Sequence, residues 1–216
     1  MRIENLTVKF NDKIVLENLS LTVNDGEITC VLGSSGVGKT TLLKSVAGLI
    51  SYEGEMDRET TSYVFQEPRL IEGVSVYKNL KLISDSEEDI LRVLKTVRLE
   101  DKKYSYPKTL SGGEKQRVNL ARAFLYPSKV ALLDEPFSSL DVKLKIELIN
   151  DFVNLWKREK KPTLFVTHDI EEALMVAGRI IVLKDGKISL DIKIDGDYPR
   201  EYSTDNEKRK LLLSAL

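Results

Sequence analysis

The chain has 216 residues, of which 42% are hydrophobic, so it can bury a sizeable core. Its 33 basic and 34 acidic residues nearly cancel to a net charge of -1, which excludes a polycation drawn to nucleic acid or anionic membranes by overall charge. The single cysteine, Cys30, excludes a disulfide framework and a cysteine-based zinc site, and we expect it in the core. No apolar run approaches the about 20 residues that span a bilayer, and the N-terminus lacks a signal-peptide core, so we expect a cytosolic protein.

The N-terminal region has the pattern of several β-strands. Residues 2–10 alternate in part between polar and apolar side chains, as half-buried strands do. After a turn signal at Asn11-Asp12, two shorter apolar runs follow over 14–16 and 18–23. Phe10 has two interpretations: a core aromatic, which the pattern alone favours, or a flat apolar ring that stacks on a base.

A glycine-rich loop follows the next apolar run. Gly33–Thr40 reads Gly-Ser-Ser-Gly-Val-Gly-Lys-Thr and fits the phosphate-loop pattern G-x-x-x-x-G-K-[ST] without a mismatch. A predicted buried strand over 27–32 precedes it, and a predicted helix over 41–48 follows. The glycines let the main chain approach a phosphate, and the helix N-terminus favours an anion. Lys39 would reach the β- and γ-phosphates and Thr40 would take a Mg²⁺ position, so a nucleotide site is favoured over a glycine-rich turn that binds nothing.

The next segment is polar and rich in turn residues. Its composition over 50–64 predicts a short hairpin, and a strand over 63–65 ends at Gln66 because Pro68 follows closely. A glutamine at the carboxyl end of a strand can face a ligand in an open α/β sheet. The alternative is a loop glutamine in solvent.

Residues 72–108 change to a helical pattern. Helical spacing is present over 76–80 and 86–98, and Ser86 has the chemistry of an N-cap with acidic residues in the first turn. We therefore predict a small helical insertion.

A second glycine-containing turn occupies 110–114 and reads Leu-Ser-Gly-Gly-Glu. It precedes a predicted helix over 114–124, and a helix N-terminus behind a serine and two glycines can attract an anion. The alternative is an ordinary N-capped helix with a flexible lead-in, and this turn alone does not decide between them.

A buried strand over 130–134 ends in two carboxylates, Asp134 and Glu135. Buried acids are rare unless they are paired or bound to a cation. Beside a phosphate loop, Asp134 is placed to hold Mg²⁺ through its water shell, and Glu135 to polarise the water that attacks the γ-phosphate. The alternative is a surface turn. An N-cap-like segment, 138–141, then leads into a predicted helix over 142–160.

The next strand, over 163–167, ends at His168, the only histidine. A lone histidine is more often structural than catalytic. This one follows a strand end, as do the phosphate loop, Gln66 and Asp134, and open α/β sheets bind ligands at that edge. The remaining pattern predicts a helix, a strand, a hairpin turn and a terminal amphipathic helix, at 170–177, 179–183, 184–187 and about 210–213.

In this order the motifs resemble the ATP-binding cassette ATPases, the nucleotide-binding subunits of ABC transporters. The resemblance covers about residues 1–190, and its signature motif is highly specific because other phosphate-loop ATPases lack it. The matches are Gly33–Thr40 to the Walker A loop, Gln66 to the Q-loop, Leu110–Glu114 to the signature motif, Asp134 and Glu135 to the end of Walker B and its catalytic carboxylate, 138–141 to the D-loop, and His168 to the switch histidine. Phe10 falls at the position of the family's adenine-stacking aromatic, which reverses the preference for a core role.

The resemblance implies an α/β fold: a P-loop NTPase (RecA-like) core with an N-terminal antiparallel β subdomain and a small helical insertion. It implies an ATPase domain over 1–190, with a helical subdomain at about 70–127 inserted in it. Residues 191–216 are then a short C-terminal extension with a terminal helix.

The resemblance also implies the roles of individual residues. The catalytic residues would be Glu135, His168 and Lys39, and the metal residues would be Thr40, Gln66 and Asp134, partly through water. The ATP-binding residues would be Phe10, Gly33, Ser34, Ser35, Gly36, Val37, Gly38, Lys39, Thr40 and Thr41 and, from a second chain, Ser111, Gly112, Gly113 and Asp141. Two chains would pack head to tail, with ATP between the Walker A loop of one and the signature motif of the other.

A narrower resemblance, carried by 64–70, 134–141 and 167–173, is to importer cassettes of the nitrate/sulfonate/taurine type. It implies that ATP and Mg²⁺ power the uptake of a small solute. The implied partners are a second cassette, integral membrane permease subunits and an external solute-binding protein, with no nucleic acid. The chain would be cytoplasmic and peripheral on the inner face of the cell membrane. The stretch 39–66 and the helical insertion are shorter than is usual in this group.

Two other functions are compatible with a cassette. One is a soluble ATP-gated clamp in repair, translation or cofactor assembly, but the long coiled-coil insertion or second cassette typical of such proteins is missing from this sequence. The other is a regulator that binds ATP without hydrolysing it, which the intact Glu135 and His168 disfavour.

Overall fold

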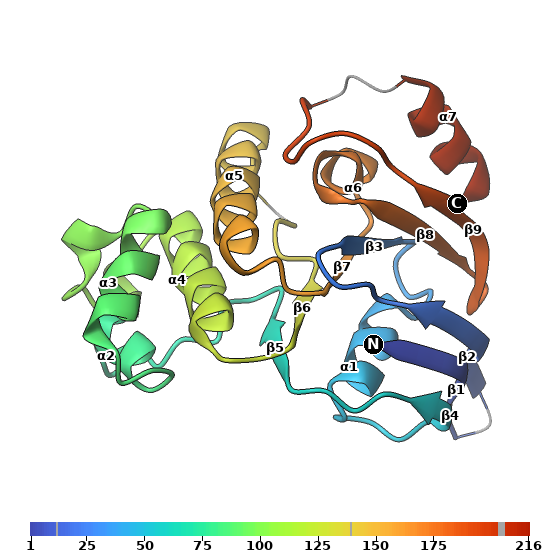
Figure 1. Cartoon of the computed structure of the whole chain (residues 1–216), viewed down its shortest axis with the longest axis horizontal. Coiled ribbons are helices and arrows are strands. Elements are labelled where there is room, and N and C mark those ends of the chain that lie inside the picture. Colours follow the sequence, from blue (N-terminus) through green and yellow to red (C-terminus); the bar gives the residue numbers. More distant parts are fainter. Residues whose placement is uncertain (12, 139, 203–205) are drawn as a thin grey trace.

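A computed structural model describes residues 1–11, 13–138, 140–202 and 206–216. These residues form two sheets. One has three strands in the order β2-β1-β4, and the other has six strands in the order β5-β6-β7-β3-β8-β9. Helices pack around the larger sheet and extend from one end of it (Figure 1). This arrangement is the expected α/β fold, with an antiparallel N-terminal sheet beside a largely parallel core.

The small sheet consists of β1 (Arg2–Phe10), β2 (Lys13–Thr22) and β4 (Glu53–Met56). The prediction of two separate runs at 14–16 and 18–23 was wrong, because β2 is continuous through both. Asn18 adopts a φ of 50° and its N–H donates to Thr7 Oγ1 at 3.0 Å. The polar interruption at Asn18 therefore falls within an irregular part of the β1–β2 pairing and does not end the strand. In the predicted turn at Asn11-Asp12, Asp12 lies outside the described residues.

The predicted hairpin over 50–64 was also wrong. β4 pairs antiparallel with β1, with Met56 opposite Ile3, whereas β5 (Thr61–Val64) pairs parallel with β6 (Val130–Asp134) in the larger sheet. The two strands therefore belong to different sheets. Local composition indicated two short strands, but their partners lie far away in the sequence.

The larger sheet places several strand ends at one edge. Its remaining strands are β3 (Ile28–Leu32), β7 (Thr163–Thr167), β8 (Arg179–Lys184) and β9 (Lys187–Lys193). β5, β6, β7, β3 and β8 run parallel, and β9 alone pairs antiparallel. Because parallel strands end on the same side, the residues after β3, β5, β6 and β7 meet there.

The helices are α1 (Lys39–Val46), α2 (Val76–Lys81), α3 (Glu87–Thr96), α4 (Gly112–Leu125), α5 (Val142–Glu159), α6 (Ile170–Val176) and α7 (Asn206–Ala215). The helices α2, α3 and α4 gather at one end of the molecule, far from β1, β2 and β4 (Figure 1). Helix α4 begins earlier than predicted, because Ser111 and Glu114 form a reciprocal capping box at its start. Ser86 caps α3 as predicted.

Two apolar clusters cover the two faces of the larger sheet. In β3, Ile28, Cys30 and Leu32 belong to the cluster that includes the helical end, and Val31 belongs to the cluster beneath the small sheet and α1. This alternation follows from the period of two in a strand. Cys30 is fully buried, as predicted, and burial raises the pKa of its thiol.

An ion network centred on the buried Asp151 joins α4 and α5. The carboxylate of Asp151 on α5 pairs with Arg117 Nε of α4 at 2.8 Å and with Arg98 at 2.9 Å, and Arg117 also pairs with Glu147. Asp151 is only 2% exposed. The network therefore fixes the start of α4 relative to α5.

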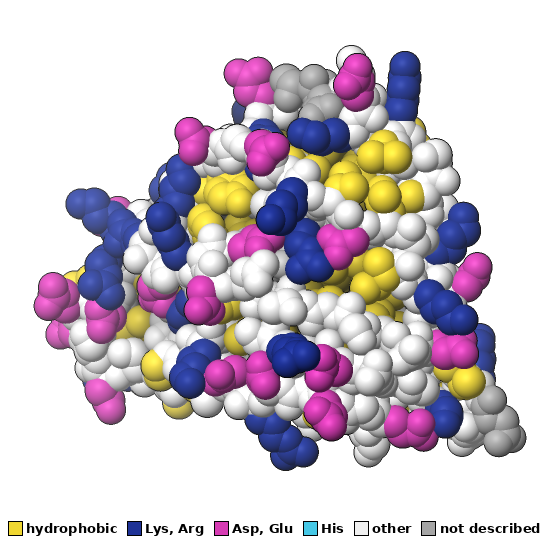
Figure 2. Space-filling view, turned by 45° about the vertical axis from the view of Figure 1, so that its right-hand side comes forward, with side chains coloured by type: hydrophobic (Ala, Val, Ile, Leu, Met, Phe, Trp, Pro, Cys, Tyr) yellow, Lys and Arg dark blue, Asp and Glu magenta, His cyan; other side chains and the backbone are white. Residues whose placement is uncertain are grey.

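The surface carries both positively and negatively charged side chains. On the face in Figure 2, basic and acidic side chains are interspersed, and neither sign dominates a large region. Among the helices of the described residues, none combines the length and apolarity needed to cross a membrane.

Candidate functional site

The loop between β3 and α1 is shaped by glycines. Gly36 and Gly38 have φ values of 80° and 113°. At Gly38 a Cβ would lie 2.7 Å from Leu16 Cδ2, and at Gly33 it would lie 2.8 Å from the Leu183 carbonyl oxygen. A side chain at either position would collide with neighbouring residues, so glycine is required there. Without side chains, the main chain of the loop can approach a phosphate closely.

Lys39 opens α1 and lies folded over this loop. Its side chain is 4% exposed, and Nζ donates to the carbonyl oxygens of Gly33 at 2.8 Å and Ser34 at 2.9 Å. The first turn of α1 has no acidic residue. A buried cation beside a helix N-terminus without acids gives the loop the electrostatics of an anion site.

Thr40 and Asp134 form the second part of the site. Thr40 Oγ1 donates to Asp134 Oδ1 at 2.8 Å, and Asp134 is 7% exposed at the end of β6. Hydroxyl and carboxylate oxygens are ligands that Mg²⁺ prefers, so this pair fits that ion. Among the described residues, no cluster of three or more His, Cys, Asp or Glu could hold a metal ion.

Sequence reasoning missed Tyr63, which also contacts Asp134. Tyr63 Oη donates to Asp134 Oδ2 at 2.8 Å. Burial, followed by the negative charge of Asp134, raises the pKa of the Tyr63 phenol, which keeps it a proton donor. The strand pattern gave no signal for this contact, because the two residues are 71 positions apart.

Glu135 lies between two predicted catalytic residues. Its Oε1 is 3.3 Å from Lys39 Nζ, and its Oε2 is 2.9 Å from His168 Nδ1. Glu135 has a φ of 43°, which is uncommon for a residue other than glycine, and its N–H donates to the Val166 carbonyl oxygen at 2.9 Å. This backbone turn brings the carboxylate next to the phosphate loop.

Gln66 is exposed after β5 and bonds to the segment that follows Glu135. Its Nε2 donates to Ser138 Oγ at 3.0 Å, and Ser138 Oγ donates to the Glu135 carbonyl oxygen at 3.0 Å. Gln66 is therefore joined to Ser138 and not to Thr40 or Asp134. In the D-loop segment, Ser139 lies outside the described residues.

The predicted second-chain residues do not join this cluster. Among the described residues, no hydrogen bond or ion pair connects Ser111, Gly112 or Gly113 to Lys39 or Thr40. The two sets come from the starts of different helices, α4 and α1, which lie apart in Figure 1.

Two further predicted residues are Asp141 and Phe10. The Asp141 side chain caps α5 by accepting from the Leu144 N–H at 3.0 Å. Phe10 is 49% exposed, so the core role that the pattern alone favoured is wrong, and its ring remains available for stacking.

A buried network braces the strand end that bears His168. Lys145 Nζ of α5 pairs with Asp169 and with Glu172, the latter at 2.9 Å. Thr167 Oγ1 donates to Glu172 Oε2 at 2.7 Å. Burial raises the pKa of Glu172, although Thr167 and Lys145 oppose the rise. Burial acts in the same direction on Asp169, but the bond from Lys145 prevails and holds its pKa below the ordinary value.

We expect Lys145→Met to destabilise the fold by about 3 kcal/mol near neutral pH, because it leaves two poorly solvated carboxylates without their cation. In the wild type, the lowered pKa of Asp169 stabilises the fold at pH values above 3.8, the ordinary pKa of an aspartate. In the variant both folded pKa values would rise, and a raised carboxylate pKa costs stability as the pH increases.

The loss of unfolding free energy in Lys145→Met should therefore grow as the pH rises above 3.8 and 4.5, the ordinary pKa values of Asp169 and Glu172. Urea unfolding at a series of pH values measures it. The control is Lys143→Met, because Lys143 is exposed on the same helix. A deficit that stays constant with pH would show that packing, and not charge, is lost.

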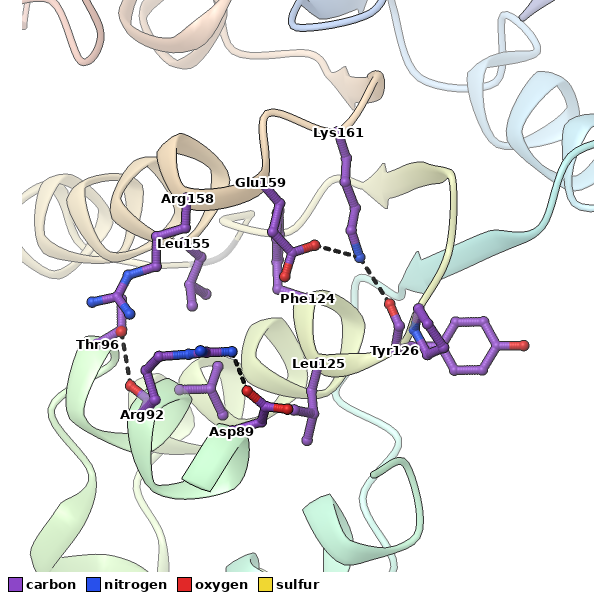
Figure 3. Close-up of a pocket in the computed structure, with 12 residues that line it drawn as sticks. Asp89, Arg92, Thr96, Phe124, Leu125, Tyr126, Leu155, Arg158, Glu159 and Lys161 are labelled. Atoms are coloured by element: carbon purple, nitrogen blue, oxygen red, sulfur yellow. Dashed lines mark hydrogen bonds and ion pairs between the residues drawn. The ribbon is translucent and has the colours of Figure 1, made fainter. Parts of the chain in front are cut away.

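A separate hollow of about 520 Å³ lies where α3 meets the ends of α4 and α5 (Figure 3). Two ion pairs border it, Arg92 with Asp89 and Lys161 with Glu159, and Lys161 also donates to the Tyr126 carbonyl oxygen at 2.8 Å. None of the predicted site residues lines this hollow. The candidate site is therefore identified by its chemistry and not by cavity volume.

Comparison with known proteins agrees with this geometry. The family described as ABC transporter matches residues 16–138. The aliphatic sulfonates import ATP-binding protein SsuB 1 of Pseudomonas syringae pv. tomato is 40% identical over 221 residues, covering 100% of this chain and 81% of that protein. The SsuB 2 protein of Streptomyces avermitilis is 39% identical, covering 100% of this chain and 90% of that protein.

Solved structures give the same result. A dimeric structure of a post-hydrolysis state of the ATP-binding cassette MJ0796, bound to ADP and Pi, matches with a TM-score of 0.76 and 30% identity, covering 91% of this chain and 99% of that chain. An ATP binding subunit of an ABC transporter matches with a TM-score of 0.79 and 26% identity, covering 90% of each chain. The ordered motifs, the fold and these relatives together show that the chain belongs to the ABC transporter family, as an ATP-hydrolysing nucleotide-binding subunit whose cofactors are ATP and Mg²⁺.

Proposed function

We propose that this chain binds Mg-ATP at the 33–40 loop, hydrolyses it with Glu135, and thereby powers the import of an aliphatic sulfonate through membrane permease subunits. The observation that carries the proposal is the contact of Glu135 with both Lys39 and His168, beside the Thr40–Asp134 pair. These groups supply an anion site, a metal site and a base on residues that are neighbours along the chain, Lys39 with Thr40 and Asp134 with Glu135.

The contacts assign a role to each residue. Lys39 would exchange its bonds with Gly33 and Ser34 for the β- and γ-phosphates. Thr40 and Asp134 would hold Mg²⁺, partly through water. Gln66 would complete the site after giving up its bond to Ser138. Bound Mg²⁺ neutralises charge on the phosphate oxygens.

The other loop residues would bind ATP through their main chain. They are Gly33, Ser34, Ser35, Gly36, Val37, Gly38 and Thr41. The exposed ring of Phe10 would stack on the adenine.

Glu135 would act as the base once ATP is bound. In the present contacts Lys39 neutralises Glu135 at 3.3 Å. Once Lys39 turns to the phosphates, the Glu135 carboxylate is free to accept a proton from the attacking water. His168, which now contacts Glu135, would then sense the γ-phosphate.

A head-to-tail dimer would complete the site. Ser111, Gly112, Gly113 and Asp141 of one chain would cover the phosphates held by the other chain, because they lie apart from Lys39 within one chain. The dimeric state of the similar ADP- and Pi-bound cassette supports this arrangement.

The transport role rests on the relatives, whose names describe ATP-binding proteins for the import of aliphatic sulfonates. We propose that residues 1–190 are the ATPase domain, with a helical subdomain at about 70–127 that meets the permease, and that 191–216 form a C-terminal extension. A solute-binding protein outside the cell would deliver the sulfonate. The chain would then lie on the cytoplasmic face of the membrane, attached through the permease.

Uptake of a radiolabelled alkanesulfonate by cells tests the transport role. Cells without this chain should lose uptake of the sulfonate and keep uptake of sulfate, and the wild-type gene should restore it. Copurification from detergent-solubilised membranes should recover an integral membrane partner. Unchanged uptake of the alkanesulfonate together with loss of nitrate uptake would reject the proposed solute. Recovery of ribosomes or DNA in place of a membrane partner would favour the clamp.

A further inference from the structure

The carboxylate of Asp134 is held at both of its oxygens. Thr40 donates to Oδ1 and Tyr63 donates to Oδ2, each at 2.8 Å. Asp134 is 7% exposed, so its oxygens have little access to solvent. Among the described residues, Tyr63 is the side chain that donates to Oδ2. A buried carboxylate oxygen that loses its donor carries an unmet desolvation cost.

Packing fixes the direction of the Tyr63 hydroxyl. Tyr63 lies on β5 opposite Leu132 of β6, two residues before Asp134. Its ring stacks on Phe65 with centroids 4.3 Å apart and planes inclined by 25°. The guanidinium carbon of Arg69 lies 4.0 Å from the centroid of the Phe65 ring. The strand and the stacked Phe65 ring thus hold the tyrosine ring in place, with its hydroxyl directed at Asp134.

We propose that Tyr63 is a positioning residue for the magnesium site. The inference rests on the proposed function, in which Thr40 and Asp134 hold Mg²⁺. If Thr40 held the ion, Tyr63 would be the remaining described side chain that donates to Asp134. It then fixes the rotation of the carboxylate and keeps Oδ1 directed toward Thr40. Groups that orient a ligand in this way commonly change metal affinity when they are removed.

The substitution Tyr63→Phe isolates the hydroxyl, because the ring and its stacking on Phe65 are kept. Binding of a fluorescent ATP analogue is measured as free Mg²⁺ is varied. The Mg²⁺ concentration for half-maximal enhancement of binding should rise about tenfold. Binding of the analogue in EDTA should stay unchanged, because the loop contacts with the phosphates remain. In turnover assays, the requirement for Mg²⁺ should rise, while kcat at saturating Mg²⁺ should stay close to that of the wild type.

Tyr126→Phe is the matched control. Tyr126 and Tyr63 line the same hollow of about 270 Å³, next to α4 and β5. The Tyr126 side chain makes no described contact with Asp134. The control therefore removes a tyrosine hydroxyl from the same region without disturbing the metal carboxylate, and its Mg²⁺ curve should match that of the wild type.

A third variant, Asp134→Asn, separates this inference from the proposed function. If Asp134→Asn raises the Mg²⁺ requirement and Tyr63→Phe leaves it unchanged, the positioning role is overturned and the metal site stands. If neither variant changes it, the metal site itself is rejected. If Tyr63→Phe weakens binding equally in EDTA and in Mg²⁺, Tyr63 shapes the nucleotide loop and the positioning role is again overturned.

Discussion

Replacing Glu135 by glutamine should lower ATP turnover by about 10²- to 10⁴-fold, the contribution expected of a positioned general base. The change keeps the size of the side chain and removes its ability to take a proton from water. It also removes the charge that faces Lys39 at 3.3 Å. Lys39 would then be free for phosphate, so ATP binding should be retained or tightened. Phosphate release measures turnover, and a fluorescent analogue measures binding.

The same variant should accumulate as an ATP-stabilised dimer, because the bound nucleotide that joins two chains is no longer consumed. Size-exclusion chromatography with light scattering should show a dimer in saturating Mg-ATP and a monomer in its absence. The control is Glu147→Gln, which makes the same change at a half-exposed carboxylate paired with Arg117. A Glu135→Gln protein that remains monomeric under saturating Mg-ATP would count heavily against the proposed mechanism.

The part of the site that the sequence predicted best is contiguous along the chain. The 33–40 loop needs a strand, glycines and a helix start in direct succession, so its local pattern contains all the information. Asp134 and His168 could be placed because parallel strands end on one edge. Their juxtaposition with Lys39 through Glu135 follows from the same rule.

Contacts between distant residues could not be predicted in this way. Tyr63 looked like an ordinary strand residue, and only the pairing of β5 with β6 brings it to Asp134. Lys145 looked like one of several charged residues on a helix, yet it neutralises Glu172, 27 positions further along and buried. The error over 50–64 has the same origin, because a short polar strand does not reveal which sheet it joins.

A mixture of two inactive variants should regain activity if the site is shared between chains. Lys39→Ala removes the phosphate cation. Gly112→Asp places a negative charge in the signature motif, where a Cβ meets nothing within 4 Å, so the fold should tolerate it. Gly113 is less suitable, because a Cβ there would lie 2.8 Å from Leu144 Cδ1. Each variant alone should form dimers in which both sites are damaged.

In a mixed dimer, Lys39 from the Gly112→Asp chain faces the intact Gly112 of the Lys39→Ala chain, so one complete site is restored. In an equimolar mixture, half of the dimers contain one chain of each variant, and each of these dimers has one intact site out of two. Turnover should therefore reach about a quarter of the wild-type value if the sites act independently. Mixing either variant with the double variant restores no site and serves as the control. Activity equal to the mean of the two separate variants would mean that each chain hydrolyses ATP alone. The separation of α4 from α1 within one chain would then have no catalytic meaning.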